Sequence, residues 1–316
     1  MKMITNATIY DYEQYLPDSY ILFDTKIIEI GPMTALPNFE GEIIDATGCI
    51  VMPGLINGHT HIYSTFARGL SVPFAPENFV EILEQLWWKL DRNITNDISY
   101  YSGIVTAVDS IKNGVTTLID HHASGEITGS LEQLKKAVVD AAHMRGVFCF
   151  ETSDRFDVDK AIEENTTFHR QHKTDQARGL FGMHASFTLK EQTLEAIQEQ
   201  LQSAPIHIHV GESKFDQEDC ITRYNETIIE RLMRHKLLTK NSLSAHGIYC
   251  TTTDLNILKD QGTTVVVNVT SNMNNSVGVP DIKRFIDHDI PVIIGNDGIS
   301  TSIAFEYEML YFAMHH

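Results

Sequence analysis

The chain has 316 residues, 42% of them hydrophobic and 21% charged, which indicates a soluble globular protein with a sizeable core. Its 24 Lys and Arg residues against 42 Asp and Glu residues give a net charge of −18, so phosphate backbones and anionic membrane surfaces are poor partners. No uncharged apolar run approaches the ~20 residues that span a bilayer, no secretory signal follows Met1, and the four cysteines form no CxxC pair. We therefore expect reduced thiols and a cytoplasmic protein.

The start of the chain holds three β-rich pieces, at 2–11, 20–31 and 42–52. A Gly-Pro pair and a Pro-Asn pair separate them as turns. We expect a small β-rich domain over residues 1–50, a partial β-sandwich, followed by a larger domain over residues 51–316.

From Cys49 onward, short apolar strands alternate with longer helical segments. The predicted strands are 49–57, 116–122, 146–151, 179–186, 205–212, 241–247, 263–269 and 291–297. Helical patterns between them include 77–92, 130–146 and 190–202. Eight apolar strands with helices between them predict an α/β fold, a parallel (β/α)8 barrel of the TIM type.

Polar or ionisable side chains stand at the carboxyl end of nearly every predicted strand. They are His59, His61, His121, His122, Glu151, His184, His209, Glu212, His246, Asn268 and Asp297. In a barrel these strand ends converge at one mouth, where such enzymes place their chemistry. Residues dispersed in the sequence are therefore expected to be neighbours in space.

Two histidine pairs suggest a metal site. In an extended segment residues i and i+2 point to the same side, so His59 and His61 can bind one ion, although one of them could be a turn residue without a ligand. Imidazole suits zinc and divalent iron alike. Of the later pair, His209 lies nearer the barrel mouth and is the predicted third ligand, whereas His207 is expected to be buried and hydrogen-bonded.

Asp297 ends a continuous apolar run, and because an isolated buried carboxylate is costly, it is the predicted fourth ligand. Glu212 is placed to shuttle protons beside a substrate, or else is a solvated loop acid. His246 could hydrogen-bond the reacting water or carbonyl, or be structural. Three histidines and an aspartate leave a position for water, whose pKa falls to about 7 on zinc, so hydroxide becomes available at neutral pH. With Glu212 and Asp297 moving protons, the pattern predicts a metal-dependent hydrolase.

The stretches MPGLINGHTHIYSTFARGL, HIHVGES, SAHG and IIGNDG together resemble the amidohydrolase superfamily, on its cytosine deaminase-like and chlorohydrolase-like side. HHAS, GMHASFTL and SNMNNSVG resemble the narrower SsnA group of aminohydrolases. The resemblance implies a mononuclear site with metal ligands His59, His61, His209 and Asp297. It also implies that Glu212 is the general acid/base and that His246 orients the water.

The resemblance further suggests substrate contacts at strand-end loops. These candidates are Arg68, His121, His122, His184, Asn272 and Asn274. Arg68 could instead be a surface residue. Of the adjacent Trp87 and Trp88, which face different ways on a helix, one could border the pocket, but core packing is the expectation for both.

The predicted fourth strand carries no lysine, the residue that bridges the ions in two-metal relatives, so we expect one ion, zinc or else iron. Related proteins continue for roughly a hundred residues that complete the small β-sandwich, so the sequence is expected to be a fragment or a shortened form of the family architecture.

The predicted reaction is hydrolytic deamination of an aminated, purine-like heterocycle with release of ammonia. Hydrolysis of another C–N or C–Cl bond, in a cyclic amide or a triazine-like ring, is the alternative at the same site. A non-catalytic metal- or ligand-binding fragment is the alternative from another class. The expected partner is a small heterocyclic molecule, and a homo-oligomer is expected from the resemblance.

Overall fold

The computed structural model describes residues 1–315, and contacts within the chain divide it into two units. The first is Met1–Gly54 and the second begins at Leu55. Among the described residues, no helix is both long and apolar enough to cross a membrane. The second unit carries the candidate site.

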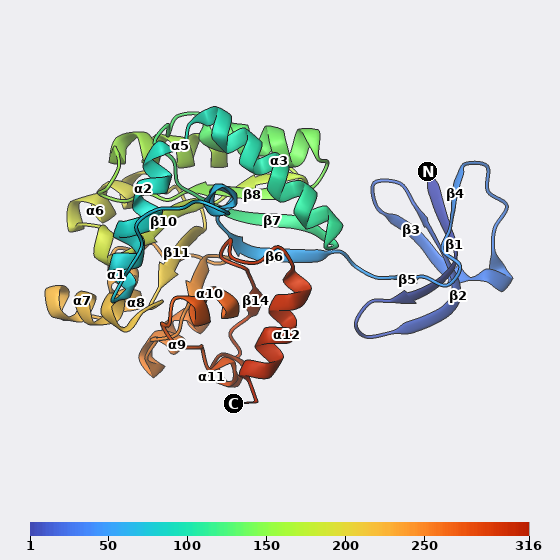
Figure 1. Cartoon of the computed structure of the whole chain (residues 1–316). Coiled ribbons are helices and arrows are strands. Elements are labelled where there is room, and N and C mark those ends of the chain that lie inside the picture. The colour runs from blue at the N-terminus through green and yellow to red at the C-terminus, as the bar shows by residue number, and fades with distance from the viewer. Residues whose placement is uncertain (316) are drawn as a thin grey trace. The chain divides into compact units, whose positions relative to one another are not determined.

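The first unit is a mixed five-stranded sheet (Figure 1). Its strands are β1 (Lys2–Tyr10), β2 (Tyr15–Phe23), β3 (Ile27–Pro32), β4 (Glu42–Asp45) and β5 (Ile50–Val51). β2 pairs antiparallel with β1 and β3, whereas β4 and β5 pair parallel with β1. Alternate residues of β1 are buried, as the two-residue period of a strand requires, and Ala7 and Ile9 pack there against Ile21 and Ala46.

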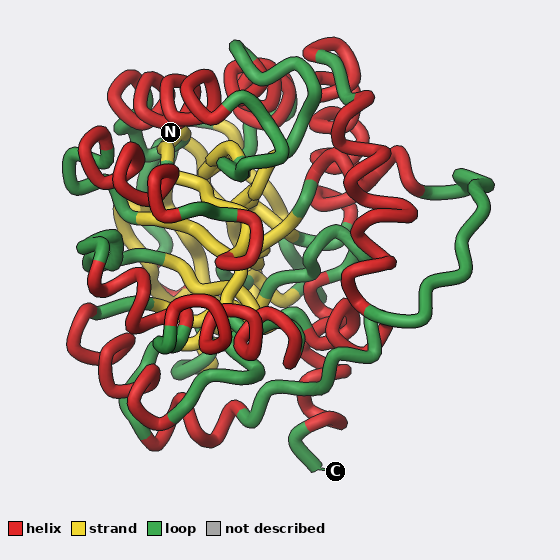
Figure 2. The backbone as a smooth tube through the Cα atoms, turned by 90° about the vertical axis from the view of Figure 1, so that its left-hand side faces the viewer, coloured by secondary structure: helices red, strands yellow, loops and turns green. Residues whose placement is uncertain are grey.

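The second unit is a parallel barrel whose strands are surrounded by helices (Figure 2). Its strands are β6 (Leu55–Thr60), β7 (Val115–His122), β8 (Arg145–Phe150), β9 (Ala177–Gly179), β10 (Phe181–Ala185), β11 (Ile206–Val210), β12 (Leu243–His246), β13 (Thr264–Val267) and β14 (Val292–Ile294). A parallel bridge between Thr152 and Met183 joins the two strand series. Backbone N–H groups of Asn296 and Asp297 donate to the His59 carbonyl, which joins the last strand to the first.

Helices follow the barrel strands in the order that a (β/α)8 barrel requires. They are α1 (Phe79–Ile82), α2 (Trp88–Leu90), α3 (Asn96–Lys112), α4 (Ser130–Lys135), α5 (Val158–Gln171), α6 (Glu191–Gln200), α7 (Lys214–Tyr224), α8 (Ile228–Arg234), α9 (Thr252–Gln261), α10 (Val269–Asn274), α11 (Ile282–Asp287) and α12 (Ile303–Ala313). Shorter turns of 3-10 or π type are Met33–Ala35, Ile62–Ala67, Leu83–Trp87, Asp91–Asn93, Lys136–Ala141 and Ser186–Thr188. Side-chain caps fix several helix starts, for example the reciprocal Thr251–Asp254 capping box of α9.

The alternation of each strand decides which side chains reach the barrel interior. In β11, Ile206, Ile208 and Val210 pack in the hydrophobic layer between strands and helices. His207 and His209 alternate with them and therefore point to the opposite side, into the barrel. The sequence IHIHV thus supplies an apolar outer face and an imidazole inner face.

The predicted barrel is confirmed, but two predicted strands are divided in the structure. The strand predicted at 179–186 forms β9, which pairs with β8, and β10, which pairs with β11. The predicted strand 49–57 is divided into β5 and β6, which belong to different units. Pro53 has no N–H to donate and Gly54 is the most flexible residue type, so a continuous strand is disfavoured at that point. The observed division falls at Gly54, four residues after the predicted boundary at 50.

A buried guanidinium organises the ends of α6 and α8. Arg231 is 1% exposed, and its Nε lies 2.8 Å from Glu191 Oε1. Its other nitrogens donate to the carbonyls of Ser186 and Leu189. Arg234 also reaches Glu191, with Nη1 2.9 Å from Oε2. Burial alone would raise the pKa of Glu191, but hydrogen bonds from the two arginines and a histidine lower it to about 2.

This arrangement predicts acid sensitivity. Because the folded pKa of Glu191 lies below its unfolded value, its stabilisation is complete above about pH 5 and is lost as the pH falls toward 2. The contribution is on the order of 2 kcal/mol after allowance for solvent screening of a side chain that is 31% exposed. Urea unfolding between pH 3.5 and 6 should therefore show a stability gap between the unchanged chain and Glu191→Gln that narrows toward acid. An equal gap at every pH would contradict this role.

Candidate active site

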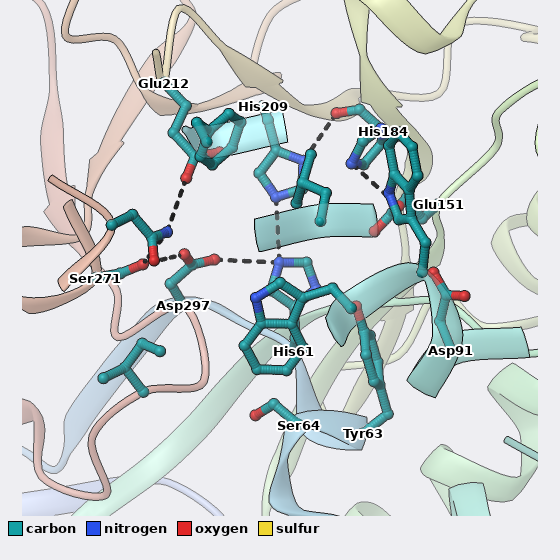
Figure 3. Close-up of a pocket in the computed structure, with 16 residues that line it drawn as sticks. His61, Tyr63, Ser64, Asp91, Glu151, His184, His209, Glu212, Ser271 and Asp297 are labelled. Carbon is teal, nitrogen blue, oxygen red and sulfur yellow. Dashed lines mark hydrogen bonds and ion pairs between the residues drawn. The ribbon is translucent and has the colours of Figure 1, made fainter. Parts of the chain in front are cut away.

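Three histidines and one aspartate meet at the carboxyl ends of three barrel strands. Figure 3 shows three of the four side chains, His61, His209 and Asp297, directed toward one another. His59 lies in β6, His61 follows that strand, His209 lies in β11, and Asp297 follows β14. Their nearest ligand atoms all lie within 4.8 Å of one another. Asp297 Oδ1 is 2.9 Å from His59 Nε2 and 3.1 Å from His61 Nε2. The structure thus brings together the four side chains that the sequence predicted as metal ligands.

The protonation pattern of this cluster fits a bound cation. His61 Nδ1 lies 2.7 Å from the His121 carbonyl and His209 Nδ1 lies 2.8 Å from the His184 carbonyl, so both Nδ1 atoms must carry protons. In the neutral rings both Nε2 atoms then present lone pairs, although they lie only 3.2 Å apart. Lone pairs and a carboxylate that converge on one point repel one another unless a cation lies between them. The donor set suits zinc.

The pKa values of the cluster residues also indicate that the cluster attracts positive charge. Burial alone would lower the pKa of His61, but its hydrogen bond with Asp297 raises it to about 9. For His59 burial prevails and lowers the pKa to about 3. Burial opposes ionisation of Asp297 too, yet its contacts with the two histidines hold its pKa well below the usual value. A proton on His61 therefore occupies the place of a cation in the metal-free cluster.

Two predicted proton-transfer groups lie beside the cluster. Glu212 follows β11, and its Oε2 is 3.6 Å from Nε2 of His246 at the end of β12. Burial raises the pKa of Glu212 to about 7, so the carboxyl can both give and take a proton near neutral pH. Asn275 Nδ2 donates to Glu212 Oε1 over 3.3 Å. Asn272 Oδ1 accepts from His246 Nδ1 over 2.8 Å, so a neutral His246 presents the lone pair of its Nε2 atom.

The backbone is strained where it presents these groups. His246 has φ +74° and Asp297 has φ +55°, both in the left-handed region that residues other than glycine rarely adopt. Such strain persists only where surrounding contacts hold it, and it gathers at functional sites. Ser271 Oγ supplies one such contact by donating to Asp297 Oδ2 over 2.5 Å. Gly295 supplies space, because a Cβ there would lie 2.7 Å from backbone atoms of His59.

The pocket over this cluster has an apolar wall formed by Phe79, Leu83, Trp87 and Trp88. The core packing expected for both tryptophans is incomplete, since both line the pocket while Trp87 also packs against Tyr63, Ile94 and Ala123. A π turn at Leu83–Trp87 interrupts the regular helix between α1 and α2, so the relative directions of neighbouring side chains differ from those in a regular helix.

Beside Trp88, whose ring centre lies 4.9 Å from Arg155 Cζ, the pocket carries an ionic network that the sequence did not indicate. Asp91 and Glu151 line the pocket, and Arg155 lies between them with its terminal nitrogens 2.8 and 2.9 Å from their carboxylates. His184 Nε2 is 3.5 Å from Glu151 Oε1. Burial raises the pKa of Asp91 to about 6 although Arg155 opposes this. Glu151 stood out as a strand-end residue, whereas no sequence signal joins residue 91 to residue 155.

Three of the predicted substrate contacts are His184, Asn272 and Asn274, and the structure places them differently. His184 lines the pocket, and its Nδ1 lies 2.8 Å from Thr188 Oγ1. Asn274 lines a neighbouring outer cavity. Asn272 is fully buried and holds His246, so it is not placed to touch a substrate.

The structure does not place Arg68, His121 or His122 in the pocket. Arg68 pairs with Asp109 at 2.6 Å and is 44% exposed on its side chain. His121 and His122 are fully buried, and His121 Nε2 lies 3.1 Å from the carbonyl of His207. The predictions for His121 and His122 are corrected, because neighbouring residues of β7 point to opposite sides of a strand that is packed on both faces. Arg68 follows the turn Ile62–Ala67, and its exposed ion pair with Asp109 matches the surface alternative.

Comparisons with known proteins agree with this geometry. The model of the amidohydrolase family matches residues 50–315. A 5'-deoxyadenosine deaminase of Methanosphaera stadtmanae is 28% identical over 292 residues, which cover 90% of this chain and 66% of that protein. A 5-methylthioadenosine/S-adenosylhomocysteine deaminase of Clostridium tetani is 28% identical over 302 residues, which cover 94% and 68%. The chain thus spans about two thirds of the length of the curated relatives that it matches.

Solved structures share the fold. An adenosine deaminase of Xanthomonas campestris with bound zinc has a TM-score of 0.84 at 19% identity, covering 99% of this chain and 73% of that one. Atrazine chlorohydrolase TrzN of Arthrobacter aurescens, complexed with zinc, has a TM-score of 0.81 at 21% identity, covering 96% and 73%. Guanine deaminase of E. coli reaches 0.86 at 15% identity, covering 100% and 79%.

Proposed function

The chain belongs to the amidohydrolase family, and on that premise we propose that it is a metal-dependent hydrolase that deaminates an adenine nucleoside and releases ammonia. The observation that carries this proposal is the grouping of Glu212, His246 and Asp297, whose ligand atoms lie within 4.8 Å of one another beside the metal cluster. A site that only stored a metal would not need an acid with a pKa near 7 facing the pocket. The curated relatives support an adenine nucleoside as the substrate, because they are deaminases of that class.

His59, His61, His209 and Asp297 would hold the ion. When bound, zinc or divalent iron would supply Lewis acidity, which lets water attack near neutral pH. We favour zinc, because it suits three imidazoles and a carboxylate and is bound in two structures of the same fold. We favour a single ion, because β10 has the sequence FGMHA and offers no lysine as a bridge.

Three side chains would move the protons. His246 would accept a hydrogen bond from the attacking water at Nε2, while Asp297 takes one proton from that water. Glu212 would protonate the ring nitrogen as the oxygen adds to the neighbouring carbon. Asp297 would then give its proton to the amino group, which leaves as ammonia. Glu212 would recover a proton from the new hydroxyl group, so every proton is accounted for and the product is the keto form of the ring.

The pocket walls would bind the rest of the nucleoside. Trp87 and Trp88 offer aromatic surface to a planar heterocycle. Asp91 and Glu151 offer hydrogen-bond acceptors to hydroxyl groups. This combination suits a neutral nucleoside in the cytoplasm, where the four free thiols of the chain would stay reduced. The resemblance of the chain to the SsnA group and its homo-oligomeric state stay predictions.

A comparison of leaving groups tests the proposal. The zinc-loaded chain would be incubated separately with 5'-deoxyadenosine, 5-methylthioadenosine, atrazine and a cyclic amide, and ammonia, chloride and ring-opened product would be measured. We expect ammonia from the nucleosides and the hypoxanthine form of the product. Chloride or ring-opened product without ammonia would replace deamination by hydrolysis of another bond. Nucleoside binding without turnover would favour a non-catalytic binding protein.

A further inference from the structure

We propose that His207 is a positioning residue for the metal ligand His59, and that Cys149 holds His207 in place by accepting a hydrogen bond from its Nδ1 atom. His59 Nδ1 lies 2.9 Å from His207 Nε2, and His207 Nδ1 lies 3.7 Å from Cys149 Sγ. All three residues are fully buried. The expected burial and hydrogen bonding of His207 are confirmed, and its contact with a ligand gives it a role beyond packing.

The second nitrogen of a metal-binding histidine decides which tautomer the ring adopts. His61 and His209 direct their Nδ1 atoms at backbone carbonyls, which are fixed acceptors. Nδ1 of His59 instead faces a side chain. For His59 Nε2 to face a cation, its Nδ1 must carry the proton, and His207 Nε2 must accept that proton in a hydrogen bond.

The acceptor role fixes the rest of the chain of hydrogen bonds. With a lone pair at Nε2, neutral His207 carries its proton at Nδ1 and donates it to the Cys149 sulfur. Cys149 Sγ lies 3.5 Å from the backbone oxygen of Asp120, to which its S–H can donate. The side chain of Asp120 in turn accepts from the backbone N–H of Ile62, 2.7 Å away, next to His61. From His59 to the Asp120 carbonyl, each donor therefore meets one acceptor in a single direction, and the Ile62 N–H holds the Asp120 carboxylate separately.

These contacts cross the barrel interior. His59 stands on β6, His207 on β11, Cys149 on β8 and Asp120 on β7. His121 also donates to the His207 carbonyl, which fixes the strand that carries both His207 and His209. A layer of the barrel that branched apolar residues usually fill is here occupied by polar groups that hold one ligand in its binding tautomer.

The inference rests on the proposed metal site, and zinc affinity tests it independently of turnover. His207→Phe keeps a ring but removes the acceptor, whereas His207→Gln retains an amide oxygen near the Nε2 position. The matched control is His122→Phe, since His122 is equally buried on a barrel strand but bonds to Ser99 rather than to a ligand. Zinc dissociation constants would be measured by competition with a chelator, and thermal midpoints of the metal-free proteins by circular dichroism.

We expect His207→Phe to weaken zinc binding by about 10–100-fold, with most of the affinity restored in His207→Gln and none lost in His122→Phe. Unchanged affinity in His207→Phe would overturn the inference, and so would equal losses in both His207 variants, because packing alone would explain them. If His207→Phe does not fold, the Cys149 variants replace it in the test. A loss of zinc affinity in Cys149→Val that Cys149→Ser does not share supports the chain of hydrogen bonds. Equal zinc affinities in the two Cys149 variants overturn it. Failure of the unchanged chain to bind zinc would instead refute the proposed function.

Discussion

Glu212→Gln is expected to lower kcat for the nucleoside substrate by about 10²–10⁴-fold, the usual contribution of a general acid/base. The amide keeps the size of the side chain, and it can still contact Asn275, which donates to Glu212 Oε1 in the structure. It cannot give a proton to a ring nitrogen or recover one from the new hydroxyl group. Steady-state ammonia release at saturating substrate measures the loss.

Zinc content serves as the control for this variant. Glu212 does not belong to the four-residue cluster, so Glu212→Gln should keep its metal and its thermal midpoint. KM should change much less than kcat, because the substituted group acts in the transition state. Full turnover by a zinc-loaded, folded Glu212→Gln protein would show that another group moves the proton.

His209→Ala is expected to remove most of the zinc affinity. The change takes away one of three imidazoles and leaves the other two with Asp297. Loss of an outer hydrogen-bond partner already weakens metal binding by about 10–100-fold, so loss of a ligand should exceed about 100-fold. Activity should fall with zinc occupancy, which metal analysis and the zinc-dependent shift of the thermal midpoint would measure.

The same variant also separates folding from binding. Metal-free His209→Ala should still fold, with a thermal midpoint moderately below that of the metal-free unchanged chain, because the change removes the hydrogen bond from His209 Nδ1 to the His184 carbonyl. The thermal shift on adding zinc should disappear. A variant that retained both stoichiometric zinc and the thermal shift would exclude His209 as a ligand.

The sequence predicted the metal cluster because its members mark strand ends. An HxH pair after an apolar strand, a second pair in IHIHV and an aspartate after VIIGN each carry a local signal, and the barrel brings such ends together. The orientation of His207 toward the interior follows from the period of a strand. To predict these features, it was enough to know the fold class and the alternation of side chains along a strand.

Other parts of the site depend on contacts that no local pattern specifies. Arg155 joins Asp91 to Glu151 across segments that are far apart in the chain. The placement of Trp88 in the pocket depends on a local departure from regular helix. His121 looked like a strand-end substrate contact, but its burial depends on packing against β11. Such details follow from tertiary packing rather than from residue type.

A zinc titration of the metal-free chain, with the initial rate of ammonia release from 5'-deoxyadenosine as the readout, tests the central claim most directly. A single four-ligand site that performs deamination predicts a rate that rises in proportion to added zinc and levels off at one equivalent per chain. A folded chain that releases no ammonia at any zinc concentration, or whose rate levels off only at two equivalents, would contradict it.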